Sequence, residues 1–212
     1  MTFIAVIDYG MGNLRSVSKA LEHVAPGARV EVTSDPALVS AAERVVFPGQ
    51  GAMPDCMREM EARGLRPVVL SAAKGKPFLG ICIGLQMLFE SSEEGDVRGL
   101  SVLPGRVRRF HQDVMRDRDG RRLKVPHMGW NQVRQQQQHP LWSGIEDGTR
   151  FYFVHSFYAE SADPGLVSGV SDYGLPFTCA VARDNIFAVQ FHPEKSHTAG
   201  LRLLSNFVDW TP

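Results

Sequence analysis

A cysteine between two glycines is the side chain in this sequence best placed to act as a nucleophile. Cys82 lies in Gly80-Ile81-Cys82-Ile83-Gly84-Leu85-Gln86, directly after the apolar residues Pro77-Phe78-Leu79. The pattern predicts a buried strand, a tight turn and then an amphipathic segment with Leu85, Met87, Leu88 and Phe89. A nucleophile on such a turn projects from the end of a sheet, and glycines avoid crowding there. The N-terminus of a following helix favours the thiolate, which is the reactive form of cysteine.

A candidate base and acid occur far downstream, in Phe191-His192-Pro193-Glu194. The apolar residues 186–191 predict a strand that delivers His192 to the edge of a sheet. The carboxylate of Glu194 could then hold the imidazole in one tautomer and stabilise its protonated form. A thiol, a base and an orienting acid together indicate acyl-transfer chemistry. Taken singly, each motif has a plainer interpretation, an inert core cysteine or a solvated loop.

A third motif, Pro48-Gly49-Gln50-Gly51, follows a predicted strand at residues 44–47. On its own it is typical of a turn. Beside a nucleophile turn, the backbone N–H groups of the two glycines are suited to binding an oxyanion. The second donor would be the N–H of Ile83, the residue after the nucleophile.

The bulk composition predicts an ordinary cytoplasmic globular protein. The chain has 212 residues, 43% hydrophobic and 22% charged, with 23 basic and 23 acidic side chains. Zero net charge argues against a dedicated nucleic-acid or membrane-surface binder, and no apolar run is long enough to cross a bilayer. Three cysteines, Cys56, Cys82 and Cys179, indicate a reducing compartment rather than a disulfide framework, and no Cys/His cluster has zinc-ligand spacing. We therefore expect no metal, and we interpret Cys56 and Cys179 as structural.

Strands and helices alternate in the first half of the chain. Strands are predicted at residues 3–8, 30–33, 44–47 and 77–81, and helices at 14–24, 56–63 and 66–74. This alternation predicts an α/β fold with a largely parallel central sheet and helices on both faces. Active sites gather at the carboxyl ends of such strands, so the motifs at 48–51 and 80–84 are expected to converge.

The second half predicts an antiparallel β extension of that sheet, closed by a helix at 197–210. Its expected strands are short and lie at residues 100–110, 121–125, 150–159, 165–171, 177–183 and 186–191. The glutamine tetrad at 135–138 is interpreted as a polar surface loop. No repeat or long linker divides the sequence, so one domain spanning residues 1–212 is expected.

Two further segments have open interpretations. The basic segment at 106–124 is either a solvated hairpin or a docking surface, and it contains Arg106, Arg108, Arg109, Arg116, Arg118, Arg121, Arg122 and Lys124. The segment Pro126-His127-Met128-Gly129-Trp130-Asn131 is either a buried turn or, if exposed, a protein interface.

Together these motifs resemble the class-I, triad-type glutamine amidotransferases, which have a flavodoxin-like fold. Within that family the chain is similar to the glutaminase subunits of imidazole glycerol phosphate synthases. The resemblance covers nearly the whole chain. Its markers are the three motifs above with Ile7-Asp8-Tyr9-Gly10-Met11-Gly12-Asn13-Leu14, Pro126–Asn131, Val154-His155-Ser156-Phe157-Tyr158 and Lys195-Ser196.

The resemblance implies a role for each matching residue. Cys82 would be the nucleophile, His192 the general base and acid, and Glu194 the orienting acid. Residues implied to bind the oxyanion or the glutamine are Gly49, Gln50, Gly51, Ile83, Gln86, His155, Ser156 and Phe157. Residues implied to meet a partner protein are Asn13, His127, Met128, Gly129, Trp130, Asn131 and Lys195.

The implied activity is hydrolysis of L-glutamine to glutamate and ammonia without a cofactor. The implied partner is a (β/α)8-barrel cyclase subunit, bound as a heterodimer, which uses the ammonia to make imidazole glycerol phosphate and an aminoimidazole carboxamide ribotide in histidine biosynthesis. Two alternatives stay open. The chain could serve another synthase or act as a γ-glutamyl hydrolase, or it could be a scaffold that has kept the fold without the activity.

Overall fold

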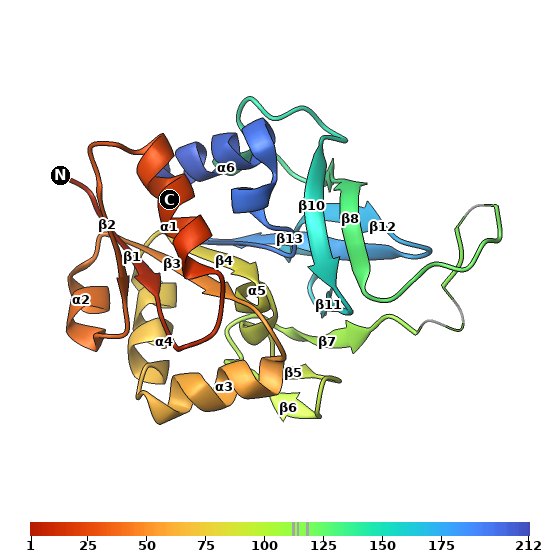
Figure 1. Ribbon diagram of the computed structural model, residues 1–212, viewed down its shortest axis with the longest axis horizontal. Coiled ribbons are helices and arrows are strands. Elements are labelled where there is room, and N and C mark those ends of the chain that lie inside the picture. The colour runs from red at the N-terminus through yellow and green to blue at the C-terminus, as the bar shows by residue number, and fades with distance from the viewer. Residues whose placement is uncertain (112, 114, 118) are drawn as a thin grey trace.

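The computed structural model describes residues 1–111, 113, 115–117 and 119–212. These residues form one twelve-stranded sheet and a separate two-stranded sheet. The main path of the large sheet runs β2-β1-β3-β4-β14-β13-β11-β7-β5-β6, and β12 and β9 branch from β13. Helices α1 and α6 lie on one face of its parallel part, and α3 and α4 lie on the other (Figure 1). The predicted mixed α/β architecture is confirmed.

The parallel part consists of an edge strand, β2, that is partly exposed, and inner strands that are largely apolar and buried. Its members are β1 (Phe3–Ile7), β2 (Arg29–Thr33), β3 (Arg44–Gly49), β4 (Phe78–Cys82) and β14 (Ile186–Val189). Every residue of β1, β4 and β14 is buried. Continuous apolar strands are expected where helices cover both faces of a sheet, because neither face then meets water.

The helices of this part largely match the sequence prediction. They are α1 (Leu14–Val24), α2 (Pro36–Ala41), α3 (Met53–Ala62), α4 (Arg66–Gly75), α5 (Ile83–Met87) and α6 (His197–Asp209). Helix α2 was not predicted, although Asp35 caps it by accepting a hydrogen bond from the Ala37 N–H at 2.8 Å. The prediction of an amphipathic segment after Cys82 is wrong, because helix α5 ends at Met87 and all of its residues are buried.

The antiparallel extension leaves β14 through β13 (Pro176–Arg183) and continues to β11 and β7. Its other strands are β5 (Ser91–Ser92), β6 (Val97–Arg98), β7 (Gly105–Arg109), β9 (Arg134–Gln135), β11 (Phe157–Ser161) and β12 (Val167–Asp172). The pairing of β5 with β7 is parallel, and the other pairings are antiparallel. The separate sheet pairs β8 (His127–Gln132) with β10 (Arg150–His155). It stands beside the antiparallel end of the large sheet (Figure 1).

Three predictions for this half need correction, and one strand was not predicted. Residues 121–125 form no strand, only an isolated bridge between Arg116 and Arg122. The expected strand at 150–159 is two strands separated at Ser156. Gln135 belongs to β9, so the glutamine tetrad is only partly a loop. Strand β8 was not foreseen, because glycine and histidine in the Pro-His-Met-Gly-Trp-Asn segment weaken the strand signal.

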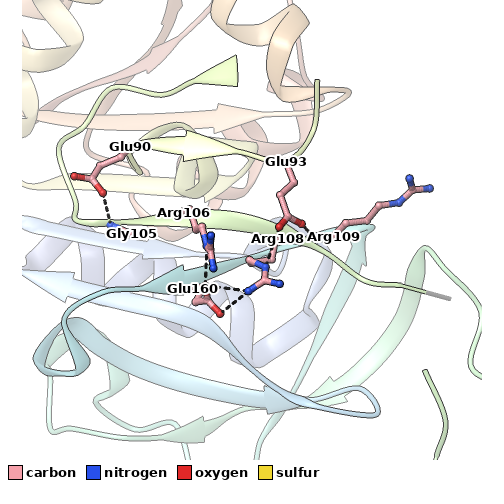
Figure 2. Close-up of polar contacts among 7 residues, drawn as sticks. All are labelled: Glu90, Glu93, Gly105, Arg106, Arg108, Arg109 and Glu160. Carbon is pink, nitrogen blue, oxygen red and sulfur yellow. Dashed lines mark hydrogen bonds and ion pairs between the residues drawn. The ribbon is translucent and has the colours of Figure 1, made fainter. Parts of the chain in front are cut away.

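The first part of the basic segment is an ion-pair network across β7 and β11 (Figure 2). Arg106 and Arg108 both donate to the carboxylate of Glu160, and Arg108 also pairs with Glu93 at 3.0 Å. Glu93 in turn accepts from the Arg109 N–H at 2.8 Å. Arg106 and Arg108 are therefore locally neutralised, and such exposed pairs each contribute less than about 1 kcal/mol. Arg118 of the same segment lies outside the described residues.

No helix among the described residues is long and apolar enough to cross a membrane.

The close packing of β3 against the nucleophile turn makes a testable prediction at Gly84. A Cβ atom there would lie 1.8 Å from the carbonyl oxygen of Phe47, which is backbone and cannot move aside. We expect Gly84→Ala to lower the free energy of unfolding by about 3 kcal/mol or more, measured by urea denaturation. The control is Gly75→Ala in α4, where nothing lies within 4 Å of the added Cβ. That change should be neutral or stabilising by up to about 1 kcal/mol, and equal losses in both variants would contradict the prediction.

Candidate active site

The nucleophile turn is built by β4 and two flanking glycines. Strand β4 ends at Cys82, which has φ 57° and ψ −110°, a conformation that L-residues rarely adopt. Gly84 packs against the Phe47 carbonyl, and a Cβ on Gly80 would lie 2.9 Å from the Ala188 Cβ. The glycines therefore allow β3, β4 and β14 to approach one another beneath the sulfur. A backbone held in this region at a cysteine is a feature of functional sites.

His192 reaches the sulfur because β14 runs parallel to β4. The register places Val189 opposite Ile81, so the chain leaving β14 passes beside Cys82. The His192 N–H donates to the Tyr152 carbonyl at 2.9 Å, and the Ser196 hydroxyl donates to the His192 carbonyl at 2.6 Å. These bonds fix the backbone on which the imidazole is mounted.

The imidazole of His192 is oriented by Glu194. Its Nδ1 lies 2.8 Å from Oε1 of Glu194, and both side chains are almost fully buried. Burial by itself would lower the pKa of His192, but the Cys82 sulfur and the Glu194 carboxylate together raise that pKa to about 10. Among the described residues, Nε2 of His192 has no hydrogen-bond partner. This nitrogen is therefore free to exchange a proton with a group in the adjoining cavity.

A cavity of about 330 Å³ adjoins Cys82 and His192. Nine residues expected at the site line it, namely Gln50, Gly51, Cys82, Ile83, Gln86, His155, Ser156, Phe157 and His192. Gly49 is paired in register with Cys82, and a Cβ there would lie 2.3 Å from the Tyr9 hydroxyl. The motifs at 48–51 and 80–84 therefore converge as expected. Glu94, Pro126 and Val154 also line the cavity, and none of the three was predicted to do so.

Gln86 lines this cavity and has one amide atom without a hydrogen-bond partner among the described residues. Its Nε2 donates to the Phe157 carbonyl at 3.1 Å and to Oε1 of Gln190 at 3.0 Å. Both N–H groups of the amide are thus used inside the protein. Its Oε1 is buried and has no partner among the described residues. A buried acceptor without a partner is costly, so a ligand that donates there would be stabilised.

A chain of hydrogen bonds through two buried histidines ends at the Phe157 carbonyl. A carbonyl only accepts, so Nδ1 of His155 carries the proton that it shares with Phe157 O at 2.8 Å. Nε2 of neutral His155 then accepts from Nδ1 of His127 at 2.9 Å. Nε2 of His127 accepts in turn from the Asn131 amide at 3.3 Å. Burial lowers the pKa of His127 to about 4 and that of His155 to about 3, so both are neutral at physiological pH.

The residues expected at a partner surface divide into two groups. Met128 and Trp130 project from the same face of β8 and are 62% and 42% exposed. Asn13 is also exposed, and Lys195 lies partly buried with its Nζ 6.0 Å from the Tyr152 ring centroid. His127 is only 3% exposed. Alternation along β8 turns its side chain inward to His155, so its part in a partner surface stays a prediction.

Two polar residues near the site were missed. Glu94 accepts from the Met53 N–H at 2.7 Å and is half-buried, and burial raises its pKa. Gln190 is fully buried, and its Nε2 lies 3.7 Å from the Cys82 sulfur. A signal for Gln190 existed, because a glutamine inside an otherwise apolar segment must find polar partners. No metal-binding cluster of three His, Cys, Asp or Glu side chains occurs in the described part of the chain.

A model of the class-I glutamine amidotransferase family matches residues 5–210. The chain belongs to this family. Two curated relatives of this chain are both named imidazole glycerol phosphate synthase subunit HisH. The protein of Dechloromonas aromatica is 71% identical over 209 residues, covering 99% of this chain and 97% of its own length. That of Aromatoleum aromaticum is 68% identical over 212 residues, covering 100% of both. Within the class, the chain therefore belongs with the HisH subunits.

Distant solved structures share the fold. A crystal structure of a glutamine amidotransferase has a TM-score of 0.71 at 17% identity, covering 97% of both chains. The PurLQS structure from Thermotoga maritima has a TM-score of 0.70 at 19% identity, covering 98% of both chains. These structures therefore share the fold of this chain, but their sequence identity to it is too low to assign a function.

The buried histidine pair predicts a loss of stability in acid. The unfolded chain binds protons at these imidazoles near pH 6.5, whereas the folded chain resists them until about pH 4 for His127 and about pH 3 for His155. The unfolded state therefore binds more protons below pH 6.5, and stability falls as the pH falls. We expect a loss on the order of 2 kcal/mol per histidine by about pH 5.

Urea denaturation at several pH values, with NMR titration of the two imidazoles, measures this effect. His192 has the opposite sign: its raised pKa adds stability below pH 6.5 that is lost as the pH rises toward 10. Most of this contribution is already present at pH 6.5, so it changes little between pH 6.5 and 5. Titration of His127 and His155 near pH 6.5 in the folded protein would contradict the prediction.

Proposed function

We propose that this chain hydrolyses L-glutamine to glutamate and ammonia with Cys82 as nucleophile, His192 as general base and acid, and Glu194 as orienting acid. The observation that carries the proposal is the meeting of three features in one cavity. These are a cysteine on a strained strand-to-helix turn, an imidazole held by a buried carboxylate, and the bare acceptor of Gln86. A thiolate beside an imidazolium is the activated form of a cysteine nucleophile.

The reaction proceeds by two acyl transfers. The Cys82 sulfur attacks the side-chain amide carbon of glutamine, and the carbon–oxygen double bond opens to an oxyanion. As the oxyanion collapses, the carbon–nitrogen bond breaks and Nε2 of His192 gives its proton to the departing ammonia. Neutral His192 then removes a proton from water, whose oxygen attacks the thioester. Glutamate leaves, and the proton on His192 restores the starting ion pair with the sulfur.

The oxyanion would be bound by backbone N–H groups of Ile83 and Gly51. Ile83 follows the nucleophile, which is the usual position of one such donor. The Gln50 carbonyl accepts from the Cys56 thiol at 3.6 Å, so the N–H of Gly51 in the same peptide points away from Cys56. Both residues line the cavity. Loss of one donor of this kind typically costs about 10²–10³ in rate.

Two side chains are suited to recognising the rest of the substrate. Oε1 of Gln86 would accept an N–H of glutamine, since its own amide hydrogens are already used. Glu94 would attract the α-ammonium group, because it places a carboxylate at the cavity wall. The Met53 N–H that binds one of its oxygens keeps this carboxylate in position. Opposite charges that are partly shielded from water attract each other more strongly than in bulk solvent.

The relatives named as HisH subunits support a specific destination for the ammonia. We infer that this single domain works in the cytoplasm as a heterodimer with a cyclase subunit of (β/α)8-barrel fold. The cyclase would use the ammonia to make imidazole glycerol phosphate and an aminoimidazole carboxamide ribotide. The exposed face of β8 with Met128 and Trp130 fits a partner, since aromatic and methionine side chains are enriched at interfaces. The proposed surface also includes Asn13, Gly129, Asn131 and Lys195. His127 supports it from the interior.

Replacement of the nucleophile tests the proposal. We expect Cys82→Ser to lower glutamine-dependent synthesis by the reconstituted pair by about 10³-fold or more, because an alcohol is a far weaker nucleophile than a thiolate. Synthesis from added ammonium salts should continue, since it bypasses this site. The matched control is Cys179→Ser, which changes a buried cysteine of β13 that does not line the cavity. Retention of glutamine-dependent synthesis by Cys82→Ser would remove Cys82 from its role.

A further inference from the structure

We propose that Gln190 is a further catalytic residue, whose side-chain N–H stabilises the negative charge on the Cys82 sulfur. This inference rests on the proposed function, because it assigns Gln190 a part in the same acyl transfer. Gln190 belongs to none of the motifs that define the triad. It lies on the segment that delivers His192, two residues before it.

The contact itself is fully buried. Nε2 of Gln190 donates to the Cys82 sulfur at 3.7 Å, within the longer range of hydrogen bonds to sulfur. Gln190 has no exposed surface and Cys82 is 4% exposed, so water does not compete for the sulfur on this side. The Gln190 backbone is also fixed, because its N–H donates to the Cys179 carbonyl at 2.8 Å.

The direction of this hydrogen bond follows from its neighbours. The Phe157 carbonyl can only accept, and it therefore faces the N–H groups of Gln86 rather than the oxygen of that amide. The second N–H of Gln86 then points to Gln190, which must present its own oxygen, Oε1, at 3.0 Å. With that oxygen turned to Gln86, the amide nitrogen of Gln190 faces the sulfur. A reversed Gln190 would place two donors against each other.

This chain of amides gives the sulfur a donor that is set before substrate arrives. An N–H next to a thiolate forms a charge-assisted hydrogen bond, which is about twice as strong as a neutral one. The bond weakens once the sulfur becomes the neutral thioester, so Gln190 favours the attacking form. His192 supplies and removes protons, whereas Gln190 transfers none. The two side chains therefore act on the same sulfur in different ways.

The test measures how fast iodoacetamide alkylates Cys82 as a function of pH, using the whole chain without glutamine. Only the thiolate reacts, so the pH of half-maximal rate reports its stability. We expect Gln190→Leu to raise that pH by about one unit and to lower the alkylation rate below it roughly tenfold. Cys56 and Cys179 should not interfere, because burial raises the pKa of both thiols, that of Cys56 to about 11.

Further variants keep the test decisive. Gln190→Glu preserves size and should raise the half-maximal pH further, since a carboxylate repels the thiolate. The matched control is Gln135→Leu, which removes a remote amide bonded to the Ile145 carbonyl and should leave the profile unchanged. Thermal unfolding identifies variants that fail to fold. If both Gln190 variants fail, the side-chain N–H resonances of Gln190 in the wild-type chain should still shift as Cys82 is titrated or alkylated.

A wild-type alkylation profile in either folded Gln190 variant would overturn the proposal, as would unresponsive Gln190 N–H resonances. Steady-state kinetics give a second readout. Because Gln190 acts by raising the fraction of thiolate, its loss should lower kcat/KM for glutamine hydrolysis about tenfold below the half-maximal pH and leave it little changed well above that pH. Failure of the proposed function would look different, since the chain would then lack glutamine turnover while the alkylation profile still depended on Gln190.

Discussion

Strand β14 pairs with β4 in parallel, from Ile186 opposite Phe78 to Val189 opposite Ile81. These two strands are more than a hundred residues apart in sequence, and their pairing brings His192 to Cys82. The pairing depends on the small side chains between them, since Gly80 lies against Ala188. The sheet thus brings nucleophile and base together through backbone hydrogen bonds, and the short helix α5 then follows the nucleophile.

A second constraint is the satisfaction of buried polar groups around the cavity. The Phe157 carbonyl accepts hydrogen bonds from His155 and Gln86. His155 is held in turn by His127 and Asn131, and Gln86 also donates to Gln190. Such groups are costly to bury unless each finds a partner, so their orientations determine one another. Oε1 of Gln86 is left over in this network, and Gln86 lines the space where a substrate would bind.

Much of this arrangement could be predicted from the sequence, and the failures have physical causes. The strands around Cys82 and His192 are continuous apolar runs, with glycines at the turn after the first, and this pattern is visible without knowledge of the rest of the fold. Strand β8 was missed because its residues suit a strand only when paired with β10. The inward orientation of the His127 side chain was missed for the same reason, since alternation is visible only once the strand is known. The partners of Glu94 and Gln190 come from distant segments. The apolar segment around Gln190 indicated that its amide needs polar partners, but it could not indicate which ones.

Glutamate release from L-glutamine tests the central claim most directly, measured with this chain alone and then with the cyclase and its ribotide ligand. We expect little release by the chain alone and strong release with both, abolished by blocking Cys82 with an electrophile that mimics glutamine. Full activity without the partner would contradict the chain's assignment as part of a synthase. Absence of glutamate under every condition would contradict the triad itself.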